Sequence, residues 1–151
     1  MVTQKVYIIA LFIAVKMVFD ANKFKELSDY VHNAPYEDGY DSLLNVNYQI
    51  QIVPQINEDG TANGIPAELY ARNDAPWFIH IWEGLEEHIW KGLLFHEMGE
   101  QYFRVIEDMG KTEGHNAIIP HELEFLKERY GVENLLDYVS FCDKYEKDGI
   151  E

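Results

Sequence analysis

The sequence predicts an α+β fold, in which a small antiparallel sheet is followed by a long helix and further carboxyl-terminal helices. Residues 46–56 alternate between apolar and polar with the two-residue period of strands, and residues 77–82 are rich in aromatic and β-branched residues. From residue 84 onward, apolar residues recur every three or four positions, which is typical of helices. The 151 residues suit one domain, which we divide into an apolar amino-terminal element (1–19), a small sheet (46–82) and a helical half (84–145).

The apolar amino-terminal element contains an unbroken run, VYIIALFIAV, at residues 6–15. A membrane-spanning helix needs about 20 such residues, so we expect no membrane span here. No small-residue cleavage site follows the run, which disfavours a signal peptide. We therefore expect a packed helix or strand, with a targeting or anchor segment as the alternative.

A first helix is expected after residue 20, where Asp20 or Asn22 can cap the free backbone N–H groups. The segment NAPYEDG at residues 33–39 ends this helix. We expect strands at residues 46–56, 67–72 and 77–82. Pro54 favours a sheet edge for the first of these, because proline cannot donate a ladder hydrogen bond.

The helical half is expected to begin with a long helix over residues 84–109, which Gly110 ends. Residues 111–119 are predicted to be a connecting loop. Pro120 suits the first turn of a helix over 121–130, and Gly131 ends that helix. A last helix is expected over 134–145.

Composition narrows the functional classes. The net charge is −15, from 27 acidic and 12 basic residues. Such a chain repels phosphate backbones, so we expect no nucleic-acid partner. The single cysteine excludes an intrachain disulfide, and we expect a cytoplasmic protein. The sequence does not indicate an oligomeric state.

The informative motif is HEMGE at residues 96–100, in the middle of the predicted long helix. His96 and Glu100 are one turn apart, so their side chains project from the same apolar face. A buried carboxylate is costly unless it is paired or binds a metal. An imidazole and a carboxylate at this spacing suit Zn²⁺ or another divalent ion. The alternative is a metal-free core in which His96 bonds a backbone carbonyl and Glu100 pairs with Arg104.

A third ligand is expected from the segment after Gly110. His115 and His121 lie 19 and 25 residues after His96, far enough for the chain to reverse. We slightly prefer His121, at the start of a helix that can face back, and both could be used together. Other groups are expected to be structural or solvated: His80, His88, Glu122 and Glu128, with His88 a candidate to support a ligand.

A strand, then a helix carrying His-Glu-x-x-[His/Glu], then a downstream His or Glu resembles the zincin-like metallopeptidases, and also short archaeal and phage proteins regarded as metal-dependent. The resemblance covers residues 77–129. It implies that residues 77–82 form an edge strand that aligns a peptide, that His96 is a zinc ligand and that Glu97 is the general base. Glu100 would replace the usual second histidine, which makes the metal a weaker Lewis acid.

Taken together, these features predict a zinc-dependent hydrolase that acts on a peptide or protein substrate through metal-activated water. Two alternatives stay open. One is a non-catalytic protein whose metal is closed in by His96, Glu100, His115 and His121. The other is a metal-free acidic interaction module, such as a DNA mimic, that docks a basic partner.

Overall fold

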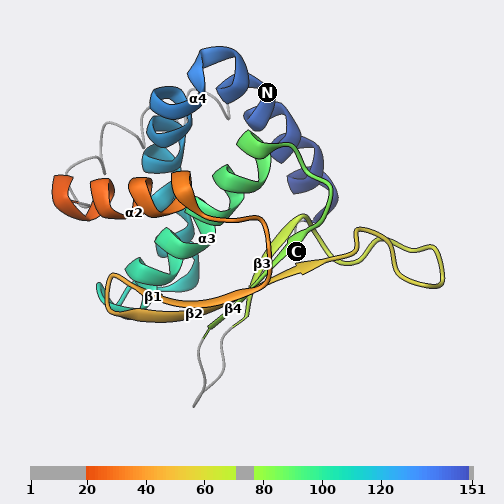
Figure 1. Cartoon of the computed structure of the whole chain (residues 1–151), viewed down its shortest axis with the longest axis horizontal. Helices are drawn as coiled ribbons and strands as arrows, with labels where there is room; N and C mark the ends of the chain where they lie inside the picture. Colours follow the sequence, from red (N-terminus) through yellow and green to blue (C-terminus); the bar gives the residue numbers. More distant parts are fainter. Residues whose placement is uncertain (1–19, 71–76, 150–151) are drawn as a thin grey trace.

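The computed structural model describes residues 20–70 and 77–149, and it confirms the α+β class. The described chain runs through α2 (Ala21–Asn33), β1 (Gly39–Leu43), β2 (Val46–Val53), β3 (Ala67–Tyr70), β4 (Trp77–Trp82), α3 (Glu87–Val105) and α4 (Lys111–Gly149). The helices gather on one face of a four-stranded sheet (Figure 1). The predicted apolar element, residues 1–19, lies outside the described residues.

The sheet is mixed, so the prediction of an antiparallel sheet is wrong. Its strand order is β1-β2-β4-β3, with antiparallel outer pairs and a parallel central pair, β2 and β4. Strand β1 was not predicted, because its residues follow a turn-rich segment. Leu44 and Asn45 both adopt positive φ, 54° and 64°, in the tight turn that joins β1 to β2.

The edge strand is also different from the one predicted. The strand at residues 77–82, β4, lies between β2 and β3, and the edge strands are β1 and β3. The segment WFIHIW is apolar at five of its six positions, which suits an inner strand that pairs with a neighbour on each side. The predicted edge position of the strand at 46–56 is also wrong, because β2 lies between β1 and β4. Pro54 directly follows the last residue of β2, so it removes no ladder hydrogen bond.

Helix α2 begins as predicted. The side chain of Asp20 accepts a hydrogen bond from the backbone N–H of Lys23 at 3.0 Å, and it is the N-cap. Leu27 and Val31, one turn apart, are fully buried. This apolar face packs α2 onto α3.

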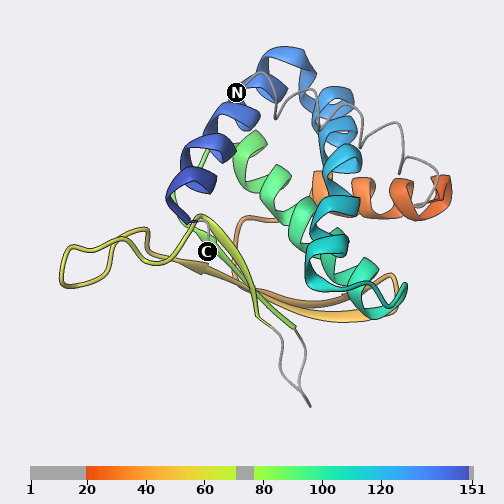
Figure 2. The same ribbon diagram turned by 180° about the vertical axis from the view of Figure 1, so that it is seen from behind.

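Helix α3 lies between the sheet and α4, which explains its extensive burial (Figure 2). It begins at Glu87 and ends at Val105, and is therefore shorter at both ends than predicted. The sequence predicted a single apolar stripe, whereas the structure buries nearly every side chain from His88 to Phe103. The Tyr48 hydroxyl of β2 donates to the Met98 carbonyl at 3.3 Å and ties the sheet to this helix.

Helix α4 begins earlier than predicted. Residues 111–119 are helical instead of a loop, and Pro120 stands inside the helix. Burial of Ala117 and Ile118 stabilises this helical segment. This stabilisation outweighs the cost of the backbone hydrogen bond that is lost at Pro120. Gly131 breaks the helix as predicted, with φ 86° and ψ 168°. We call residues 111–130 the first half of α4 and residues 132–149 the second half.

No helix within the described ranges combines the length and the apolar character that crossing a membrane requires.

Candidate metal centre

Glycines allow α3 and the two halves of α4 to approach closely around residues 96–100. A Cβ atom on Gly99 would lie 2.1 Å from Cδ1 of Ile118, and one on Gly92 would lie 2.4 Å from the Tyr138 ring. A Cβ atom on Gly114 would lie 2.8 Å from Cγ of Arg104. Side chains at these positions would force the helices apart. The glycines therefore set the distance across which residues of α3 and α4 meet.

Three side-chain atoms from these helices form a small triangle. Nε2 of His96 lies 3.0 Å from Nδ1 of His115 and 3.3 Å from Oε1 of Glu100. Nδ1 of His115 lies 3.2 Å from the same oxygen of Glu100. His96 and Glu100 are buried, and His115 is partly exposed. These are three of the four ligands predicted from the sequence.

The triangle has the dimensions of three ligands on a tetrahedral metal ion. With ligands about 2.0–2.1 Å from zinc, neighbouring ligand atoms lie about 3.3–3.4 Å apart. The observed separations are 3.0, 3.2 and 3.3 Å. Two imidazole nitrogens and a carboxylate oxygen are also a ligand set that zinc accepts. The residues present therefore fit a divalent metal ion.

Glu122 and Tyr138 hold the His96 ring in place. Nδ1 of His96 bonds one carboxylate oxygen of Glu122, and the Tyr138 hydroxyl donates to the other. A proton on Nδ1 directed at a carboxylate leaves the Nε2 lone pair for the triangle. A carboxylate behind a ligating histidine is the usual support of a metal site.

Charges around the triangle favour an ionised Glu100. Burial alone would raise the pKa of Glu100, but hydrogen bonds from His115 and His96 lower it. Arg104 adds a contact of 3.4 Å to the second oxygen of Glu100. Burial would lower the pKa of His96, whereas Glu122 and Glu100 raise it well above its ordinary value. A metal ion at the triangle would therefore compete with a proton on His96.

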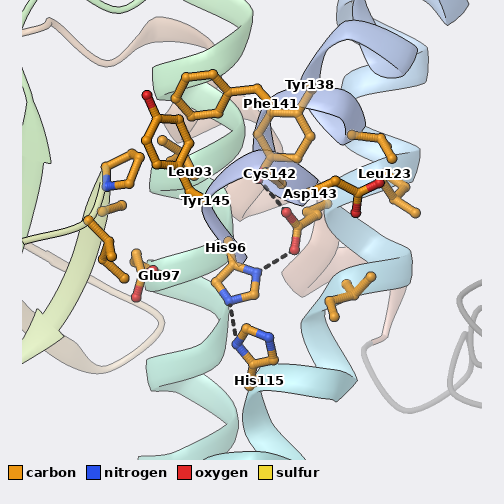
Figure 3. A pocket seen from close by; sticks show the side chains of 16 residues that line it. Leu93, His96, Glu97, His115, Leu123, Tyr138, Phe141, Cys142, Asp143 and Tyr145 are labelled. Atoms are coloured by element: carbon orange, nitrogen blue, oxygen red, sulfur yellow. Dashed lines mark hydrogen bonds and ion pairs between the residues drawn. The ribbon is translucent and has the colours of Figure 1, made fainter. Parts of the chain in front are cut away.

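Glu97, the predicted general base, is outside the triangle. Its side chain extends away from His115 on the other side of the His96 ring (Figure 3). Burial raises the pKa of Glu97 to about 8, an effect that His96 opposes and Glu100 reinforces. A carboxyl group with this pKa exchanges its proton near neutral pH, as a general base or acid requires.

A cavity of about 260 Å³ adjoins the triangle. His96, Glu97 and His115 all line it, so the predicted base and two predicted ligands face one space. Its other walls come from the loop before β3, from α3 and from both halves of α4 (Figure 3). The cavity gives a substrate a place beside the triangle.

The preferred third ligand, His121, is not at the triangle. It is 2% exposed, and its ring packs against Phe24 and Phe103. Since the segment from residue 111 is helical rather than a loop, residues 115 and 121 point to different sides of α4. The structure therefore brings His115 to His96 and Glu100, and leaves His121 in the apolar core.

The remaining histidines considered in the sequence lie away from the triangle. The ring of His80 packs on Tyr70, with centroids 4.7 Å apart. His88 pairs with Asp137 at 2.7 Å and, with Glu86, forms a second group of potential ligands near the start of α3. Glu86 and Asp137 are exposed, and such groups are common without an ion.

Sequence reasoning missed the role of Glu122, which it assigned to a solvated helix face. That assignment is wrong, because Glu122 is 4% exposed and bonds His96. The signal was the spacing from His115: seven residues, or two helical turns, place both on one face. It was hidden because residues 111–119 were predicted to be a loop. No pattern in the sequence around Tyr138 indicated its contact with Glu122.

Comparison of the chain with protein-family models, with curated proteins and with solved structures finds no match in any of the three.

Proposed function

We propose that this chain is a metal-dependent hydrolase that holds a zinc ion through His96, Glu100 and His115. The observation that carries the proposal is the triangle, whose three atoms lie 3.0–3.3 Å apart at the wall of a cavity. The three atoms of the triangle are all potential acceptors. When the single proton of a neutral His96 ring lies on Nδ1, towards Glu122, Nε2 of His96 has no proton to donate to the other two. A metal ion satisfies all three atoms at once.

Each residue then has a distinct task. Zinc, when bound, would polarise a substrate carbonyl and activate water. Glu122 and Tyr138 orient His96, and Arg104 holds the second oxygen of Glu100. Glu97 lines the same cavity and would take the proton of the attacking water.

The sheet edge supports a peptide as the substrate. β3 is an edge strand, and the loop that leads into it, through Ile65 and Pro66 to Ala67, lines the cavity. An extended peptide that adds to a sheet edge gains main-chain hydrogen bonds. A peptide on β3 would run beside the cavity and bring a carbonyl group towards the triangle. The edge strand would then be β3, rather than residues 77–82.

The two alternatives make different demands. A closed structural site needs a fourth protein ligand, and within the described residues the group around His96 contains three. A metal-free acidic module needs His96 and Glu100 to be paired internally. The contacts from His96 to Glu122 and from Glu100 to Arg104 favour that reading, so metal content must separate the two.

The test is hydrolysis of a mixed fluorogenic peptide library by zinc-loaded protein. We expect cleavage by wild type and a loss of about 10²–10⁴-fold in Glu97→Gln, the range for a general base. The Glu97→Gln variant should retain zinc, whereas His115→Ala should lose both zinc and activity. Cleavage that persists in zinc-free protein would contradict the proposal.

A further inference from the structure

The walls of the cavity are largely apolar apart from the groups of the candidate metal centre. Leu93 from α3, Ile119 and Leu123 from the first half of α4, and Val139 and Phe141 from the second half contribute aliphatic and aromatic surface. On the second half of α4, Asp143 is the one charged residue that lines the cavity among those the structure describes. A charged substrate group would lose its hydration there without a set of charged partners.

The cavity is continuous with the proposed chemistry. Leu93 precedes His96 by three residues, one turn of α3, and both line the cavity together with Glu97. One substrate molecule can therefore place a side group in the cavity and a carbonyl at the triangle. The cavity is not a remote binding site.

The size of the cavity selects its occupant. An apolar cavity of about 150 Å³ in a protein is large enough to bind benzene. The cavity here measures about 260 Å³, which accommodates a phenyl or indole ring or a branched aliphatic chain. A methyl group would leave most of the cavity empty. Such a small group binds less favourably, because it makes few van der Waals contacts with the walls.

We propose that this cavity selects substrates carrying an aromatic or branched aliphatic group next to the carbonyl that is hydrolysed. The inference rests on the proposed function, because it assumes that the carbonyl binds at the triangle. It adds that Leu93, Val139 and Phe141 determine specificity through apolar contact, rather than through charge.

The test measures binding, and it uses two hydroxamates that share one metal-binding group. Acetohydroxamic acid and 3-phenylpropanohydroxamic acid are titrated into zinc-loaded protein, and zinc content is measured in every sample. We expect the phenyl compound to bind wild type at least tenfold more tightly. In Val139→Trp, which fills the cavity, this preference should fall to less than threefold while acetohydroxamate affinity is kept.

Leu136→Trp is the matched control, because Leu136 lies on the same half of α4 but is 57% exposed and does not line the cavity. It should retain the full preference. Leu93→Phe is a second, smaller filling variant in case Val139→Trp does not fold.

The outcomes separate the two proposals. Zinc and acetohydroxamate binding with equal affinity for both compounds in wild type would overturn the apolar specificity alone. A preference that persists in both filling variants would overturn it as well. Wild type that binds no zinc and neither hydroxamate would overturn the proposed function and, with it, this inference.

Discussion

The carboxylate of Glu122 bonds Nδ1 of His96, although the two residues are 26 positions apart and lie on different helices. This contact fixes which nitrogen of His96 faces Glu100 and His115. It makes Glu122 as much a part of the candidate centre as the three residues of the triangle.

Replacing Glu122 by Gln should weaken zinc binding about 10- to 100-fold, the usual cost of removing the carboxylate behind a ligating histidine. The amide keeps the shape of the side chain but not its charge, so Nδ1 of His96 is held less firmly. Zinc dissociation constants measured by chelator competition check this. Glu124→Gln, two residues on, is the control and should match wild type. Equal affinities for Glu122→Gln and wild type would remove Glu122 from the centre.

His115 and His121 should respond in opposite ways to replacement by Ala. His115 is partly exposed at the triangle, so His115→Ala should lose zinc and keep most of its thermal stability. His121 is 2% exposed between Phe24 and Phe103, so His121→Ala should unfold at lower temperature and still bind zinc when folded. Zinc content and thermal unfolding of both variants decide this. Zinc loss in His121→Ala alone would restore the ligand preferred from the sequence.

Glu97→Gln should stabilise the metal-free protein in alkaline solution. Burial raises the pKa of Glu97 to about 8, against 4.5 for the ordinary group. The folded state therefore binds the proton more tightly, and the stability that Glu97 contributes falls as pH rises from about 4.5 to 8. Glutamine cannot ionise and escapes this loss.

Thermal unfolding in chelator checks this expectation. The difference in midpoint between Glu97→Gln and wild type should grow from pH 5 to pH 8.5 in favour of the variant. A constant difference across this range would show that Glu97 ionises in the folded protein as freely as in the unfolded chain.

Gly92→Ala should destabilise the protein by about 1–3 kcal/mol, the usual cost of overpacking a core. The new Cβ would lie 2.4 Å from the ring of Tyr138, which is buried and bonds Glu122. Displacing that ring should also weaken zinc binding. Urea unfolding and zinc titration measure the two effects. Gly39→Ala is the control, since its Cβ would meet nothing within 4 Å.

The sequence predicted those features that depend on local pattern. The helical period placed His96 and Glu100 on one buried face, and the caps at Asp20 and Gly131 came from their local chemistry. The sheet order was not predictable in this way, because β4 pairs in parallel with β2, which is distant from it in the sequence, and this leaves β3 at an edge.

One reason explains both why Glu122 was missed and why His121 was preferred to His115. Gly110 as a helix end and Pro120 as a helix start indicated a loop between them, but burial of Ala117 and Ile118 against α3 keeps residues 111–119 helical. A helix there changes which side chains face His96: it brings in His115 and Glu122 and turns His121 away. Tertiary packing thus outweighed the local preference.

The most direct test of the account is the metal content of the purified, untagged protein after incubation with zinc and removal of the excess. We predict about one zinc ion per chain in wild type and in His88→Ala, and none in His96→Ala. Wild type without zinc, or His96→Ala with as much zinc as wild type, would contradict the account and favour the metal-free acidic module.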